Sequence, residues 1–123
     1  MREERLWTWH VVAGVAVLVL LGLHMTIMHL DALVGVFNPE GPDPLAWANV
    51  VARGQQAFFL VSYVVLLGAA LFHGLYGLRN IVFELGPAPG VKQGVNVALT
   101  LVGVVMFAGG AWAAWAAYVL ARG

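Results

Sequence analysis

Three long apolar runs constrain this chain more than any other feature of its sequence. They cover about residues 6–30, 57–82 and 95–120, and each has the roughly 20 or more residues that cross a bilayer as a helix. Lipid offers no hydrogen-bond partner to the backbone, so a spanning run must satisfy its own amides as a helix. The sequence therefore predicts an all-α protein, a single domain over residues 1–123 with three transmembrane helices.

The connections between these runs carry the helix-breaking residues. An outer loop is expected over residues 31–56, which contain three prolines, and its second half, Leu45–Arg53, can form a short interfacial helix around Trp47. An inner loop is expected over residues 83–94, where prolines and glycines interrupt the helix. Three helices bury little surface against one another, so we expect this membrane anchor to be part of a larger helix bundle.

Composition excludes several classes of function. Hydrophobic residues make up 62% of the chain and charged residues 10%, against about 25% charged residues in soluble domains. The formal net charge is zero, which leaves no basic surface for nucleic acid. The absence of cysteine excludes a disulfide framework, a thiolate metal site and a cysteine-ligated iron–sulfur cluster. Any metal would have to be held by histidine or oxygen.

The positive charges predict the orientation in the membrane. With the N-terminus in the cytoplasm, four Lys and Arg residues lie inside and two outside, as the positive-inside rule favours. The inside group is Arg2, Arg5, Arg79 and Lys92, and the outside group is Arg53 and Arg122. The first apolar run is longer than that of a signal peptide, so we expect it to be retained as a helix.

The second apolar run contains an unusual set of polar residues. On a helix with about 100° per residue, His73, Gly77 and Asn80 lie along one stripe that ends at Glu84. Arg79 lies roughly 120° away from that stripe. Ionisable residues in a membrane helix are costly and indicate a functional site. Histidine commonly ligates haem iron, a small residue lets the flat macrocycle approach the backbone, and arginine can pair with a haem propionate or a quinone carbonyl.

The first apolar run contains three histidines at different depths. His24 lies deep toward the outer side, His10 lies about 21 Å from it near the inner interface, and His29 lies at the outer rim. His73, on the antiparallel second helix, is about ten residues of helical rise short of the level of His24. These two histidines therefore cannot share one haem. We expect two haems, each completed by a histidine of a partner subunit.

Simpler explanations remain open for the same residues. A histidine in a membrane helix can bond to a neighbouring backbone carbonyl, which applies to His73 and His24. Arg79 can serve as a snorkelling anchor at the inner interface. The remaining polar residues are explained most simply as interfacial or solvated groups: His10, His29, Asn80 and Glu84.

These residues resemble the membrane-anchor cytochrome b subunits of succinate dehydrogenase and fumarate reductase. The second helix of that family carries His-x-x-x-Gly-x-Arg and an acidic residue eleven places after the histidine, matched here by His73, Gly77, Arg79 and Glu84. The family's first helix carries Arg-x-Ser-Gly and a histidine ten places after the glycine. Gly14 and His24 keep that interval, whereas Val11 and Ala13 replace the arginine and serine. Leu85 stands where some members have a quinone-binding tyrosine.

The resemblance implies a non-catalytic subunit of an oxidoreductase complex, respiratory complex II, in the bacterial cytoplasmic membrane. Its partners would be a flavoprotein containing FAD, an iron–sulfur subunit and another membrane-anchor cytochrome b subunit, this chain being the second anchor rather than the first. Haem b, shared with that partner, and a quinone, menaquinone rather than ubiquinone, would be the cofactors. His73 would ligate the haem nearer the iron–sulfur subunit, and His24 a distal haem. Propionate or quinone contacts would come from Arg79, His10, Trp9 and Gly77, and further contacts from His29, Asn80 and Glu84.

Two alternatives belong to other classes. A haem-free anchor would only dock a soluble enzyme and bind quinone. A cytochrome b subunit of another quinone-linked dehydrogenase is disfavoured, because such subunits usually have four or more helices. A small transporter is disfavoured as well, because none of the six acidic residues lies deep within an apolar run.

Overall fold

Helices make up nearly all of the structure, which is a computed structural model and describes residues 2–29, 43 and 45–123. The described residues form α1 (Arg2–His29), α3 (Trp47–Gly54), α4 (Ala57–Glu84) and α5 (Pro89–Arg122), and no strand occurs among them. Three of these helices, α1, α4 and α5, are long and apolar enough to cross a membrane. The all-α prediction with three spanning helices is therefore confirmed.

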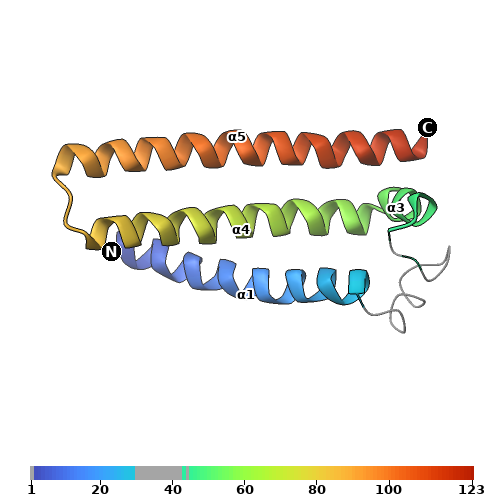
Figure 1. The fold of residues 1–123 in the computed structure, drawn as a ribbon, viewed down its shortest axis with the longest axis horizontal. Coiled ribbons are helices and arrows are strands. Elements are labelled where there is room, and N and C mark those ends of the chain that lie inside the picture. Colours follow the sequence, from blue (N-terminus) through green and yellow to red (C-terminus); the bar gives the residue numbers. More distant parts are fainter. Residues whose placement is uncertain (1, 30–42, 44) are drawn as a thin grey trace.

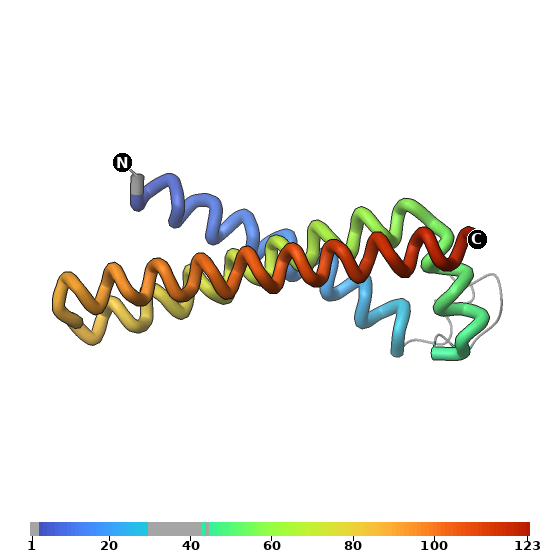
Figure 2. Tube along the Cα trace, turned by 90° about the horizontal axis from the view of Figure 1, so that it is seen from above, coloured from blue at the N-terminus to red at the C-terminus, as the bar shows by residue number. Residues whose placement is uncertain are grey.

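The three long helices lie side by side in a row with α4 in the middle (Figure 1). Helix α4 contacts both α1 and α5, whereas the described residues of α1 and α5 do not contact each other. Seen from above in Figure 2, α5 follows α4 along its length and α1 crosses α4 obliquely. The row is not a closed bundle, so most apolar side chains on its surface are available to lipid or to another chain.

The ends of the spanning helices extend beyond the sequence-based boundaries. Helix α5 begins at Pro89 rather than near residue 95, so the inner loop expected over residues 83–94 shrinks to residues 85–88. Proline is favoured at the first position of a helix, where its missing amide hydrogen costs nothing. Gly86 makes the turn with φ of +69°, a left-handed conformation that favours glycine. The prediction was wrong here because Pro89 was taken as a helix breaker when it starts a helix.

The short helix expected in the outer loop is confirmed as α3. The rest of that loop, residues 31–42 and 44, lies outside the described residues. Just after α3, the Gln55 side-chain amide donates to the backbone oxygen of Ala121 at 2.7 Å. This bond joins the connection between α3 and α4 to the C-terminal end of α5. Arg53 and Asn49 of α3 are both buried.

Glycines on α5 allow it to approach α4 closely. A Cβ atom added to Gly103 would lie 2.9 Å from Leu75 Cδ1, and one added to Gly110 would overlap the Leu67 side chain. These two glycines are seven residues apart, so both face α4. Close backbone approach at small residues is a main source of association between membrane helices. Gly109, beside Gly110, has no atom within 4 Å of its added Cβ and faces open space.

This difference between neighbouring glycines predicts different tolerance to a larger side chain. We expect Gly110→Val to reduce the free energy of unfolding by about 1–3 kcal/mol through overpacking against Leu67. Gly109→Val has the same effect on helix propensity without the overlap and serves as the control. Unfolding in mixed micelles, followed by circular dichroism, measures both variants. Equal stability of the two would contradict the packing of α5 on α4 through Gly110.

Candidate functional site

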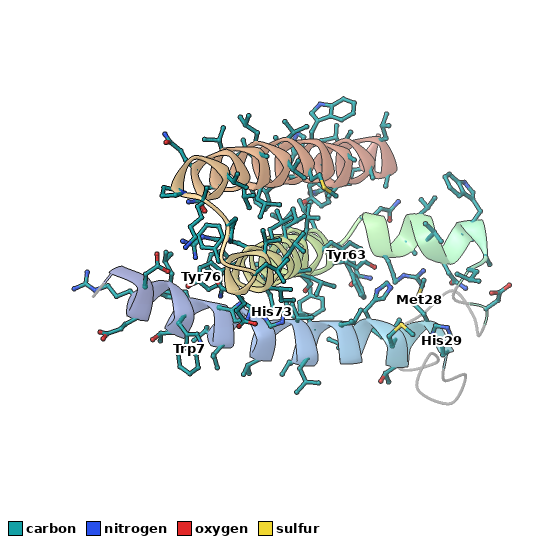
Figure 3. All side chains as sticks on the ribbon, turned by 60° about the vertical axis from the view of Figure 1, so that its left-hand side comes forward. Trp7, Met28, His29, Tyr63, His73 and Tyr76 are labelled. Carbon is teal, nitrogen blue, oxygen red and sulfur yellow. The ribbon has the colours of Figure 1, made fainter. Side chains whose placement is uncertain are left out.

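Two histidine rings stack where α1 crosses α4. The rings of His10 and His73 lie 4.2 Å apart between centroids and are inclined by only 3°. The His73 Nδ1 atom lies 3.1 Å from the backbone oxygen of His10. Figure 3 shows His73 between α4 and α1. His73 therefore makes the bond to a neighbouring carbonyl that the sequence left open, and His10 packs inside the helix contact as well.

A glycine from the opposite helix makes room for each ring. A Cβ atom added to Gly14 on α1 would lie 2.9 Å from His73 Cε1, and one added to Gly77 on α4 would lie 3.3 Å from His10 Cε1. Both helices thus carry His-x-x-x-Gly and pair antiparallel through it. Gly77, expected beneath a flat macrocycle, lies beneath His10 instead. The repeated spacing was the sequence signal that could have predicted this pairing.

The hydrogen bond of His73 determines the position of its proton. A carbonyl oxygen can only accept, so Nδ1 carries the hydrogen, and the Nε2 atom of a neutral ring keeps its lone pair. No described residue forms a hydrogen bond with Nε2 of His73. The His10 Nδ1 atom is buried and has no hydrogen-bond partner among the described residues. The pair therefore presents an imidazole of defined tautomer beside a polar atom without a partner.

Arg79 connects all three long helices at the end of the row where the N-terminus lies (Figure 1). Its guanidinium forms a salt bridge of 3.1 Å with Glu3 on α1, and its Nε donates to Asn96 Oδ1 on α5 at 2.7 Å. Its Nη1 donates to Asn80 Oδ1 at 3.1 Å, so the charged guanidinium lies beside a residue of the polar stripe. The expectation that Arg79 points away from the stripe is therefore wrong for the guanidinium, although its Cα lies off the stripe. Sequence motifs gave no signal for Glu3 or Asn96 as its partners.

His24 lies in a separate contact nearer the C-terminal end of α1. Its ring meets the Tyr63 ring edge-on, with centroids 6.0 Å apart, beside a cavity of only about 20 Å³. Tyr63 precedes His73 by ten residues along α4, so the structure has the expected difference in depth between His24 and His73. The two histidines do not come together. Among the described residues, no three His, Asp or Glu side chains gather into a metal-sized site.

The other residues selected from the sequence lie apart from the stacked pair. Trp9 is exposed, and Glu84 is exposed at the end of α4. The His29 Nδ1 atom lies 3.1 Å from the backbone oxygen of Met25, four residues earlier in the same helix. Figure 3 shows His29 at the far end of α1 from His73. None of these three residues contributes to the inner site.

An open groove of about 530 Å³ lies between α4 and α5. Its inner end is polar, with Arg79, Asn96 and Thr100, and the rest is lined mainly by apolar side chains such as those of Phe72 and Phe107. Tyr76, 8% exposed, lines the groove, and its ring centroid lies 5.3 Å from that of His10. The groove therefore adjoins the histidine pair across one aromatic ring. Asn96, Thr100 and Tyr76 were not predicted as site residues from the sequence.

Comparison with known proteins finds similarity along most of the chain. A protein of Archaeoglobus fulgidus, named succinate dehydrogenase hydrophobic membrane anchor subunit, is 28% identical over 105 residues, which cover 85% of this chain and 82% of that protein. The chain is similar to succinate dehydrogenase membrane anchors. A protein of the same name from Thermoplasma acidophilum is 22% identical over 94 residues, covering 76% of this chain and 70% of its own.

The resemblance seen in the histidine and glycine spacing is thus confirmed for succinate dehydrogenase anchors. No family model matches the chain, and no solved structure matches it. Together with the three apolar helices, the similarity supports a membrane protein that crosses the bilayer several times.

The space beside His73 can be tested by filling it. We expect Gly14→Ala to displace the His73 ring and weaken its bond to the His10 carbonyl, at a cost of about 1–3 kcal/mol relative to the control. The control is Gly22→Ala on the same helix, because no atom lies within 4 Å of a Cβ added to Gly22. Unfolding in micelles gives the stability, and nitrogen-15 NMR of the imidazoles reports the Nδ1–H of His73. An unchanged Nδ1–H resonance in Gly14→Ala would contradict the contact.

Proposed function

We propose that this chain is a membrane-anchor subunit of succinate dehydrogenase that supplies an axial histidine to haem b and connects an iron–sulfur subunit with the quinone pool. The similarity to two succinate dehydrogenase anchors carries the anchor role. The partners would be a flavoprotein, the iron–sulfur subunit and another anchor subunit. The chain itself would catalyse no bond-making step. The bacterial cytoplasmic membrane, with the N-terminus inside, remains the predicted location.

His73 is the residue of this chain that would hold haem iron. Iron binds the lone pair of an imidazole nitrogen, and metal-bound histidines usually donate their other ring hydrogen to a carbonyl or carboxylate. His73 already donates from Nδ1 to the His10 carbonyl, which leaves Nε2 as the ligating atom. Gly14 leaves room for the ring and holds it between the two helices. These contacts would orient His73 as a ligand in advance of haem binding.

The second axial ligand would come from another chain. The rings of His10 and His73 are stacked face to face, with no space for a macrocycle between them, so the two residues would not hold one haem together. His10 is therefore unsuited to be the opposite ligand without leaving its place above Gly77. A haem shared with a second anchor subunit satisfies this constraint.

His24 is a separate candidate for a second haem. It lies about ten residues of rise from His73, too far to share one macrocycle. Its ring is packed in the contact of α1 with α4 beside a very small cavity, so a macrocycle there would have to lie outside that contact. The support for the second haem is thus weaker than that for the first.

Haem, when bound, supplies a carrier for one electron at a time between the iron–sulfur subunit and quinone. The residues of this chain would orient the ligand through the bond of His73 to the His10 carbonyl. The apolar surroundings and the His73–His10 bond would adjust its reduction potential. Arg79 is held by Glu3 and Asn96 at the inner end, where it stabilises the arrangement of the helices next to the haem ligand.

Purification of the whole complex tests this function. We expect His73→Ala to remove one haem b per complex, measured by the pyridine haemochrome assay, because the axial ligand is lost. His29→Ala should keep the full haem content, because His29 bonds within its own helix. His24→Ala tests the second haem in the same assay.

The outcomes separate the parts of the proposal. Unchanged haem content in His73→Ala would refute the ligand assignment. A wild-type complex without a Soret band would favour a haem-free anchor. Failure of the flavoprotein and iron–sulfur subunits to copurify with the wild-type chain would refute the anchor role itself.

A further inference from the structure

The groove between α4 and α5 has the shape expected for a ligand with a small polar head and a long apolar tail. It runs from Arg79 and Asn96 at the inner end to Gly68 and Ala108, a length of about 18 Å at 1.5 Å per residue. Its volume of about 530 Å³ lies in the range of small-molecule sites. Because it is open along the row of helices, a ligand can enter it sideways from the bilayer.

The polar end of the groove offers hydrogen-bond donors without an excess of charge. The charge of Arg79 is already neutralised by Glu3, and Asn96 Oδ1 accepts from Arg79 Nε. The Asn96 amide hydrogens and the Thr100 hydroxyl have no hydrogen-bond partner among the described residues. Asn96 and Thr100 are four residues apart and share one face of α5. Two donors beside a neutral ion pair favour a neutral head group with acceptor oxygens over an anionic phosphate.

Aromatic side chains surround the place where such a head group would lie. The rings of Phe72 and Tyr76 are nearly parallel, with centroids 5.7 Å apart, and both line the groove. Tyr76 also contacts the ring of His10, which stacks on His73. A flat redox-active ring in the groove would thus be separated from the histidine pair by the single ring of Tyr76.

We infer that this groove binds the membrane quinone, with a quinone carbonyl accepting from Asn96 and Thr100 and the prenyl tail lying along Leu75, Gly103 and Phe107. The inference rests on the proposed function and specifies it, because it places the quinone on a single chain. Val11 and Ala13 replace the arginine and serine of the resembled family's first helix, and Leu85 stands in place of a tyrosine found in some members. The groove uses none of these positions.

Photolabelling of the purified complex in nanodiscs tests this site. The probe is a photoreactive naphthoquinone with a prenyl tail, and mass spectrometry locates the label. We expect label within residues 68–79 and 96–108, competed by unlabelled prenyl naphthoquinone. Ala108→Trp, which fills the groove, should abolish that label, whereas Ala113→Trp, outside the groove, should not.

A smaller change tests the polar end without filling the groove. Thr100→Val removes one donor and should weaken probe affinity by about two- to tenfold. Thr8→Val is its control, because the Thr8 hydroxyl donates to the Glu4 carbonyl within α1 and lies outside the groove. If Thr100→Val and the wild type bind the quinone probe with equal affinity, Thr100 does not donate to the head group.

The remaining outcomes overturn the inference in distinguishable ways. Label outside the groove, or label unaffected by Ala108→Trp, refutes the site. Competition by phosphatidylglycerol but not by unlabelled quinone makes the groove a phospholipid site. Copurification of the catalytic subunits is measured in the same preparation. If they copurify while the label lies outside the groove, the quinone site is refuted and the anchor role is retained.

Discussion

The close contact of α1 with α4 depends on two glycines that leave room for two histidine rings. Gly14 and Gly77 each face a histidine of the other helix, so the His10 and His73 rings can stack where the helices cross. In lipid, helices gain no hydrophobic energy from leaving water, and association depends on such close packing and on hydrogen bonds. The hydrogen bond from His73 to the His10 carbonyl adds to the close packing where the two helices cross.

Helix α4 serves two neighbours with two kinds of surface. Toward α1 it presents an imidazole whose tautomer is defined by a backbone carbonyl. Toward α5 it forms a groove that is polar only at the inner end. Tyr76 lies between these two regions and contacts both. One central helix thus presents the stacked histidine on one side and the groove on the other, without either occupying the space of the other.

The sequence predicted the spanning helices because their apolar runs exceed the length that a bilayer requires, and it predicted the depth difference between His24 and His73 because helical rise is regular. It misplaced the start of α5, since Pro89 can either end or begin a helix. The partners of Arg79 were not predictable from motifs, because they depend on which helix ends meet in space. The pairing of His10 with His73 was visible in the repeated His-x-x-x-Gly, but only after the helices were known to cross there.

The row arrangement has a consequence for energetic coupling between distant positions. Because described residues of α1 and α5 share no contact, substitutions on these two helices act on separate interfaces, and their effects on stability should add. Arg79 and Tyr76 are exceptions. Glu3 from α1 and Asn96 from α5 both bind the Arg79 guanidinium, and the Tyr76 hydroxyl donates to Glu3 while its ring lines the groove with α5. Through the Arg79 side chain, a substitution of Glu3 on α1 can change the orientation of the Asn96 amide at the polar end of the groove on α5. Apart from these two side chains, the described residues of α1 and α5 are expected to contribute to stability independently.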